Sequence, residues 1–224
     1  MINLNNISKR YGELVLFENF NATFEEHLVH CILGGSGVGK TTLIHMIAGL
    51  VTPDSGSVDL PENSRPSYVF QEPRLLPWFD VFGNLDFVLH EVYPDKQERQ
   101  DIILHYLEKV GLEDFAHASL QSLSGGMVQR VALCRAFAYP STLLLLDEPF
   151  IGLDSKLKEE LLEFFARIYE EDERTVFFVT HDIPEALRLA DTISVLKNRP
   201  VQVAGRFIKS EFAADLPLRI RDML

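Results

Sequence analysis

The segment from Gly34 to Thr41 has the residue types and spacing that could hold a chain of phosphates. It spells G-x-x-x-x-G-K-T and stands between an unbroken apolar run and a run with helical spacing. Glycines let successive backbone N–H groups curl around phosphate oxygens, and a helix that follows points the positive end of its dipole at them. Lys40 would add a full positive charge, and the Thr41 hydroxyl would bind Mg²⁺. The segment therefore predicts a magnesium-dependent site for nucleotide phosphates.

Two adjacent carboxylates, Asp147 and Glu148, follow a second apolar run. If that run is a strand of the same sheet, its end delivers both side chains to the edge where the phosphates bind. Asp147 could then hold Mg²⁺ through its water shell, while Glu148 could polarise an attacking water as general base. An Asp-Glu pair after a strand is more often a solvated turn when it stands alone. With the phosphate loop upstream, the pair indicates hydrolysis of a nucleoside triphosphate.

A third segment, Leu123 to Met127, reads LSGGM and begins a run with helical spacing. Ser124 is a good helix N-cap, and the two glycines could simply open the turn. The same arrangement is also a second anion-binding device, because exposed N–H groups stand at a helix N-terminus. Both interpretations stay open for this segment alone, although one nucleotide site does not need two such devices.

These three segments require a sheet that brings strand ends together. Apolar runs predict strands at 28–33, 143–146, 175–180 and 192–196, and helical patterns at 43–50, 156–169 and 183–190 alternate with them. Further strands are expected at 2–8, 20–26, 67–70 and 201–207. Strands that alternate with helices imply a mostly parallel sheet covered on both faces.

Only helical patterns fill the stretch from 73 to 139, with Asp80 and Ser124 as candidate helix caps. We therefore expect a single domain over residues 1–224. Its core lobe would comprise 1–72 and 140–224, and a helical subdomain would be inserted at about 73–139. Beyond Lys209 we expect only a short helical tail, too small for an added regulatory domain.

The chain has 224 residues, with 33 acidic against 21 basic side chains and a formal charge of −12. This excess argues against broad binding to nucleic acid or anionic lipid, because those surfaces require clustered Lys and Arg. Cys31 and Cys134 lie in apolar runs and are expected to be buried and unpaired, as in a reducing compartment. No apolar run reaches the roughly 20 residues of a membrane-spanning helix, and the first residues do not resemble a signal peptide. We expect a cytoplasmic protein with a local anion site.

Taken together, five segments resemble the ATP-binding subunit of ABC transporters. They are GGSGVGKTT, LSGG, LLLLDEP, FIGLD and the histidine of FFVTHD, and they occur in the family's order over nearly the whole chain. The resemblance implies an α/β fold of the P-loop NTPase (RecA-like) class, with a mostly parallel sheet core, N-terminal antiparallel strands and an inserted α-helical subdomain. It also implies ATP hydrolysis, with ATP and Mg²⁺ as ligands. In the working homodimer two copies face head to tail, so the LSGG segment of one closes over the ATP held by the other.

The resemblance assigns roles to matching positions of this chain. Tyr11 would stack on adenine, Gln71 would be the hinge that couples the two lobes, and His181 would contact the γ-phosphate. The ATP-binding residues are Tyr11, Gly34, Gly35, Ser36, Gly37, Val38, Gly39, Lys40, Thr41 and Thr42. The residues that contact the ATP of the partner subunit are Ser124, Gly125, Gly126 and Met127, and Asp154 belongs to the dimer-interface loop. The catalytic residues are Lys40, Gln71, Glu148 and His181, and the magnesium residues are Thr41, Gln71 and Asp147, the last through water.

Two positions depart from the family pattern. Met127 stands where the LSGG segment normally continues with Gln, and a thioether cannot make the hydrogen bonds of an amide. We expect weaker contact or coupling there, with the backbone N–H groups of Gly125 and Gly126 sufficing to bind. Gly152 stands where the family commonly has Ala, which loosens the loop but removes no chemical group. We expect activity to survive both changes.

The runs VFQEPRLLPW and LADTISVLKNRP resemble the importer branch that takes up nitrate, sulfonates, taurine or related small molecules, including vitamin precursors. The implied partners are integral membrane permease subunits and, indirectly, a substrate-binding protein, with no nucleic acid. The subunit would lie peripherally on the inner face of the cell membrane. Other proteins choose the cargo, so this chain does not name it.

Two alternatives remain, a soluble ABC-type ATPase that acts on nucleic acid and the motor of an ABC exporter. The single short helical insertion and the net charge weigh against the first, whereas an exporter would share every motor segment. A further hypothesis concerns the apolar stretch Leu75–Phe79. It either helps to line a groove near Gln71 that receives the membrane partner, or packs the two lobes together.

Overall fold

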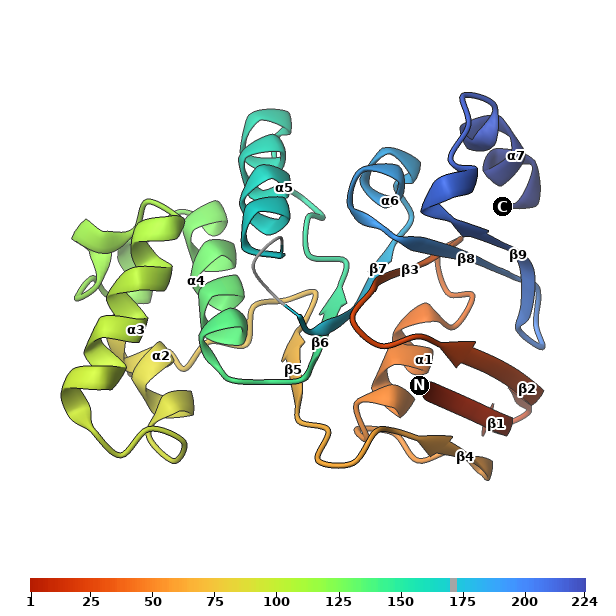
Figure 1. Cartoon of the computed structure of the whole chain (residues 1–224), viewed down its shortest axis with the longest axis horizontal. Helices are drawn as coiled ribbons and strands as arrows, with labels where there is room; N and C mark the ends of the chain where they lie inside the picture. The colour runs from red at the N-terminus through yellow and green to blue at the C-terminus, as the bar shows by residue number, and fades with distance from the viewer. Residues whose placement is uncertain (170–172) are drawn as a thin grey trace.

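The computed structural model describes residues 1–169 and 173–224 as two β-sheets with helices around them (Figure 1). The strands are β1 (Ile2–Tyr11), β2 (Leu14–Phe24), β3 (Val29–Gly34), β4 (Ser55–Asp59), β5 (Pro66–Val69), β6 (Leu143–Asp147), β7 (Thr175–Thr180), β8 (Thr192–Lys197) and β9 (Gln202–Ile208). The α-helices are α1 (Lys40–Ile47), α2 (Val81–Leu89), α3 (Lys96–Lys109), α4 (Gly125–Ala138), α5 (Ser155–Tyr169), α6 (Ile183–Leu189) and α7 (Leu216–Met223). Short 3₁₀ helices are η1 (Glu113–Phe115), η2 (Leu120–Ser122) and η3 (Lys209–Glu211).

The larger sheet has six strands in the order β5-β6-β7-β3-β8-β9. Its neighbours pair in parallel, except that β8 and β9 pair antiparallel. The smaller sheet, in the order β2-β1-β4, is antiparallel. The predicted α/β fold, with a mostly parallel core and N-terminal antiparallel strands, is therefore confirmed.

The central strands β3, β6 and β7 are buried along their whole length, as their unbroken apolar runs require. Alternate side chains feed two cores. Ile32 and Phe177 pack with α1 and the smaller sheet, whereas Cys31 and Phe178 pack on the opposite face with α5 and α6. Cys31 and Cys134 are buried free thiols, as predicted. The two layers hold the strand ends in fixed positions.

Helices α2, α3 and α4 lie together at one end of the molecule, beside the edge strand β5 (Figure 1). Each begins at a side-chain cap. Asp80 accepts a hydrogen bond from the Gly83 N–H at 2.6 Å, Asp95 one from Glu98 at 2.8 Å, and Ser124 one from Met127 at 3.3 Å. These bonds satisfy N–H groups that a helix leaves unpaired at its start. The predicted caps at Asp80 and Ser124 are confirmed.

The N-terminal strands are longer than their sequence patterns indicate. The patterns predict strands over 2–8 and 20–26, but β1 reaches Tyr11 and β2 begins at Leu14. Register shifts between β1 and β2 follow Leu4, Ile7 and Lys9. Such irregularities break the period of two on which strand prediction depends.

The part of the chain that the structure describes contains no helix with both the length and the apolar character needed to cross a bilayer.

Phe177 tests how much the central strands contribute to stability. Phe177→Ala should lower the free energy of unfolding by about 3–5 kcal/mol, because it leaves a cavity at a fully buried position. Urea unfolding followed by circular dichroism measures the change. Phe87→Ala is the matched control, since Phe87 is 59% exposed and its truncation should cost less than about 1 kcal/mol. Equal losses in the two variants would contradict this description of the core.

Candidate functional site

Three neighbouring parallel strands end at the same edge of the larger sheet. β6, β7 and β3 are adjacent in that order, and each leads directly into one segment that carries chemistry. Glu148 follows β6, His181 follows β7, and the glycine-rich loop follows β3. Ligands of open parallel sheets bind outside the carboxyl ends of the strands. Side chains that are distant in sequence therefore meet at one edge.

The glycine-rich loop is held by its own backbone and by Lys40. Lys40 Nζ donates to the carbonyl oxygens of Gly34 at 2.9 Å and Gly35 at 3.1 Å. Gly37 and Gly39 have φ angles of 72° and 117°, which residues with side chains rarely adopt. A buried positive charge at the start of α1, beside the backbone of a glycine-rich loop, is an arrangement suited to bind an anion.

Asp147 lies beneath the loop and is bonded to it. The Thr41 hydroxyl donates to Asp147 Oδ1 at 3.0 Å, and the Tyr68 hydroxyl donates to Oδ2 at 3.4 Å. Burial raises the pKa of Asp147, and the hydrogen bond from Thr41 partly offsets this effect. A hydroxyl and a carboxylate at this distance are the hard oxygen donors that Mg²⁺ prefers. The residues present therefore fit a magnesium ion.

Glu148 has a strained backbone, with φ at 46°. Its backbone N–H donates to the carbonyl of Val179 at 3.1 Å, which ties it to the end of β7. The carboxylate lies between two side chains, with Oε1 at 3.7 Å from Lys40 Nζ and Oε2 at 3.1 Å from His181 Nδ1. A left-handed conformation costs a residue with a side chain about 1–3 kcal/mol and persists where surrounding contacts hold it. Here those contacts direct the carboxylate into the site.

A cleft of about 640 Å³ gathers most of the expected nucleotide residues. Of the residues predicted to bind ATP or to act in catalysis, those that line it are Tyr11, Gly35, Ser36, Gly37, Gly39, Lys40, Thr41, Thr42, Gln71, Glu148 and His181. The remaining two contribute differently, because Val38 is buried in the core and Gly34 bonds to Lys40. The volume lies within the range of about 300–1,000 Å³ that is usual for small-molecule sites.

The LSGG segment does not line this cleft. Ser124 and Gly125 are exposed at the start of α4, while Met127 is half-buried and packs against the core. A Cβ at Gly126 would stand 2.0 Å from Leu157 Cδ2, so α4 approaches α5 closely at this point. Within one chain, the second anion-binding segment therefore takes no part in the cleft.

Asp154 also lies outside the cleft, in the loop before α5. Its Oδ1 accepts hydrogen bonds from the backbone of Lys156 at 3.1 Å and Leu157 at 3.0 Å, so it caps the helix. Gly152 in the same loop has φ at 72°, a conformation that alanine would strain. The departure at Gly152 thus fits the local backbone.

Some residues of the site have no signal in the sequence. Tyr68 reaches Asp147 from β5, Arg199 donates to the carbonyl of Gly37 from the β8–β9 turn, and Leu16 lines the cleft from β2. Each comes from an element whose approach to the loop depends on the tertiary fold. Local patterns could not have identified them.

The chain matches a protein-family model described as ABC transporter over residues 17–151, which is more than half of its length. A second model matches the shorter stretch 117–188 and is described as an AAA domain, putative AbiEii toxin, of a type IV toxin–antitoxin system.

Three similar proteins are named as ATP-binding proteins of transport systems. The bicarbonate transport protein CmpD of Synechococcus elongatus is 38% identical, with 92% of this chain and 79% of CmpD covered. The nitrate import protein NrtD of the same organism is 38% identical, with 90% and 76% covered. The taurine import protein TauB of Yersinia pestis is 36% identical, with 92% and 83% covered.

The fold is similar to a solved dimeric structure, the ATP-binding cassette MJ0796 in a post-hydrolysis state bound to ADP and Pi. The TM-score is 0.81 at 31% identity, and the match covers 93% of this chain and 99% of the other.

The bond between Thr41 and Asp147 can be tested without any ligand. Thr41→Val should lower the free energy of unfolding by about 1 kcal/mol, because the buried carboxylate loses a hydrogen-bond donor. Urea unfolding at pH 7 measures the loss. Thr41→Ser keeps the hydroxyl and should stay within about 0.5 kcal/mol of the parent. If both variants lose the same stability, the hydroxyl does not support Asp147.

Proposed function

The chain belongs to the ABC transporter family, and we propose that it is the motor subunit of an importer for a small molecule. As a member of this family it binds and hydrolyses ATP. The proposed cargo is a small ion of the nitrate, bicarbonate or taurine kind. Relatives named for these three cargoes each match at least 90% of the chain, which supports this choice.

One observation carries the proposal most directly. The cleft holds the phosphate loop, Glu148 and His181, while Ser124 and Gly125 lie exposed elsewhere on the same chain. A second copy placed head to tail would bring its own Ser124 over this cleft and complete the site. The dimeric state of MJ0796 supports this arrangement. Nucleotide would then bridge the two copies and favour the closed form by mass action.

Magnesium is the metal that we assign to this site. Thr41, Gln71 and Asp147 would hold it, Asp147 through water, and it would neutralise charge on the β- and γ-phosphates. The bonded Thr41–Asp147 pair and the position of Gln71 in the same cleft support this assignment.

We assign the hydrolytic step to Glu148, which would accept the proton of the attacking water. As the new O–P bond forms, the bond to the β-phosphate oxygen breaks and leaves ADP and inorganic phosphate. Lys40 would stabilise the negative charge on the transferred group. His181 would contact the γ-phosphate and orient the carboxylate of Glu148 relative to it. The contacts of Glu148 with both side chains support these roles.

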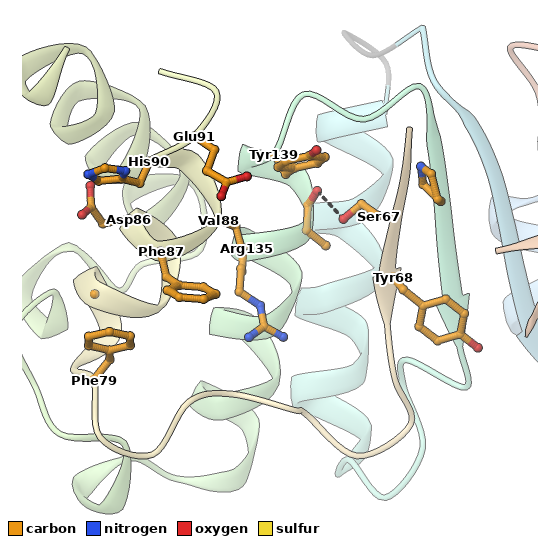
Figure 2. Close-up of a pocket in the computed structure, with 13 residues that line it drawn as sticks. Ser67, Tyr68, Phe79, Asp86, Phe87, Val88, His90, Glu91, Arg135 and Tyr139 are labelled. Carbon is orange, nitrogen blue, oxygen red and sulfur yellow. Dashed lines mark hydrogen bonds between the residues drawn. The ribbon is translucent and has the colours of Figure 1, made fainter. Parts of the chain in front are cut away.

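The stretch from about 73 to 139 would act as one helical subdomain that passes dimer closure to the membrane partner. A groove of about 680 Å³ between its helices and β5 is the surface that we assign to the permease (Figure 2). Phe79 and Phe87 form its apolar wall, and Arg135 of α4 also lines it, with its guanidinium donating to the carbonyl of Arg74 at 2.8 Å. This revises the hypothesis for Leu75–Phe79. Of that stretch only Phe79 lines the groove, whereas Trp78 is 72% exposed beside it.

The permease would hold the subunit at the inner face of the cell membrane, and a substrate-binding protein would present cargo on the other side. The import names of NrtD and TauB support this placement. The net charge of −12 supports the exclusion of nucleic acid as a partner.

Replacing the general base should trap the closed dimer. Glu148→Gln keeps the shape of the side chain but cannot accept a proton, so hydrolysis should fall by about 10²-fold or more. Light scattering should then show a doubled mass in ATP and a single mass in ADP. Glu13→Gln, on the exposed turn between β1 and β2, is the matched control and should hydrolyse normally. If Glu148→Gln hydrolyses ATP near the parent rate, Glu148 is not the general base.

The importer assignment is tested by what the subunit binds in its own host. Tagged protein from gently solubilised membranes should co-purify with a polytopic membrane protein, identified by mass spectrometry. Phe87→Asp should abolish this association, because it places a charge in the apolar wall of the groove, while ATPase activity of the free subunit stays within about twofold.

Phe115→Asp is the matched control, since Phe115 is exposed on η1 and does not line the groove. It should co-purify like the parent. Recovery of soluble partners alone would be compatible with an ATPase motor but would contradict the transporter assignment. Equal recovery of the membrane protein with Phe87→Asp and with the parent would contradict the assignment of the groove to the permease.

A further inference from the structure

A buried carboxylate accepts a hydrogen bond from Thr180, the residue before His181, and has no part in the chemistry assigned above. Glu185, in the first turn of α6, is only 5% exposed. Its Oε2 accepts a hydrogen bond from the Thr180 hydroxyl at 2.5 Å, and that hydroxyl accepts one from the Asp182 backbone at 3.0 Å. These hydrogen bonds link the last residue of β7 to the first turn of α6, and His181 lies in the segment between them.

The countercharge for Glu185 comes from a different helix. Lys158 Nζ lies 2.6 Å from Glu185 Oε1 and donates to Asp182 Oδ2 at 2.7 Å. Lys158 is in the first turn of α5, where its backbone N–H donates to the carbonyl of Asp154 at 2.9 Å. One side chain thus ties the loop of Asp154 to the loop of His181.

Lys158 does not stabilise the helix in which it lies. A positive charge in the first turn opposes the helix dipole, whereas Asp182 and Glu185 on the neighbouring helix attract it. Burial raises the pKa of Asp182, but the hydrogen bonds from Lys158 and the Glu185 backbone outweigh this effect and leave the pKa below its usual value. Burial lowers the pKa of Lys158, and the two carboxylates more than restore it. Lys158 therefore joins Asp182 and Glu185 in one cluster.

We propose that Lys158 is a positioning residue that makes the loop of His181 follow the loop of Asp154. This inference rests on the proposed function, in which Asp154 faces the second copy and His181 faces the γ-phosphate. When the second copy displaces the loop of Asp154, the first turn of α5 moves with it. Lys158 transmits that movement through Asp182 and Glu185 to His181. Closure of the dimer and placement of His181 are thereby linked within each chain.

A second ion pair between the same helices provides the matched control. Arg188, in the last turn of α6, lies against Glu159 of α5 and is distant along α6 from His181. The ion pairs of its guanidinium are with Glu159 and Glu163 of α5. Arg188→Met therefore removes an inter-helix ion pair and leaves the link to His181 intact.

The test compares steady-state hydrolysis of Lys158→Met and Arg188→Met in the full chain. Lys158→Met should lower kcat about tenfold while KM for ATP changes by less than about twofold, because the phosphate loop is untouched and His181 is misplaced. Arg188→Met should retain the parent kcat. Lys158→Arg should recover most of the activity, since it keeps the charge and the reach. A parent kcat in Lys158→Met would overturn the proposal.

Loss of Lys158 also leaves Glu185 buried without its countercharge, which destabilises the fold by itself. The double variant Lys158→Met/Glu185→Gln removes that charge but keeps a side chain able to bond with Thr180. Its urea midpoint should return toward the parent value while kcat stays about tenfold low. Recovery of kcat together with stability would show a structural role only and would overturn the proposal.

Measurements on the parent protein distinguish a failure of the role assigned to Lys158 from a failure of the proposed motor function. A parent that does not hydrolyse ATP, or a Glu148→Gln variant that does not dimerise in ATP, contradicts the motor itself. A parent that behaves as expected beside an active Lys158→Met variant contradicts only the role of Lys158.

Discussion

The parallel pairing of β6, β7 and β3 is the constraint on which the site depends. Their hydrogen-bonded register places Asp147 opposite Val179 and Leu33 opposite Thr180, so three segments distant in sequence leave the sheet at one level. Burial on both faces prevents the strands from slipping, because a shift of one residue would turn their apolar side chains from one core to the other. The two cores therefore hold the catalytic residues in place, and one core residue, Leu16, also lines the cleft.

The carboxyl-end edge of the larger sheet contains a buried carboxylate and a strained backbone, which are both unusual in a solvated turn. Asp147 is 4% exposed and Glu148 has a left-handed backbone. Thr41, Lys40 and His181 offset these costs with hydrogen bonds and opposite charge. Such preorganisation is useful where negative charge develops during phosphoryl transfer, since the site need not reorganise at that moment. In the proposed dimer this edge lacks only the anion-binding turn at Ser124, which the second copy would supply.

The sequence predicted what depends on local spacing and left out what depends on packing. The phosphate loop, the central strands and the caps at Asp80 and Ser124 each follow from neighbouring residue types. By contrast, the full lengths of β1 and β2 were hidden by irregular register, and Tyr68 and Arg199 reach the site only because distant elements fold beside it. The cluster of Lys158 and Glu185 was missed for the same reason, because its members belong to different helices. For Leu75–Phe79 the sequence left two interpretations open, a groove wall or packing between the lobes, because apolar composition does not tell which side chains face a cavity.

In the proposed dimer one complete site is built from two copies placed head to tail. A mixed cross-linking experiment tests it directly, using one copy with Ser36→Cys in the phosphate loop and another with Ser124→Cys. Both native cysteines are buried, so they should not compete for the oxidant. A covalent heterodimer should form on mild oxidation only when the two variants are mixed and ATP with Mg²⁺ is present. Absence of this heterodimer in ATP, or equal yield without nucleotide, would contradict this arrangement.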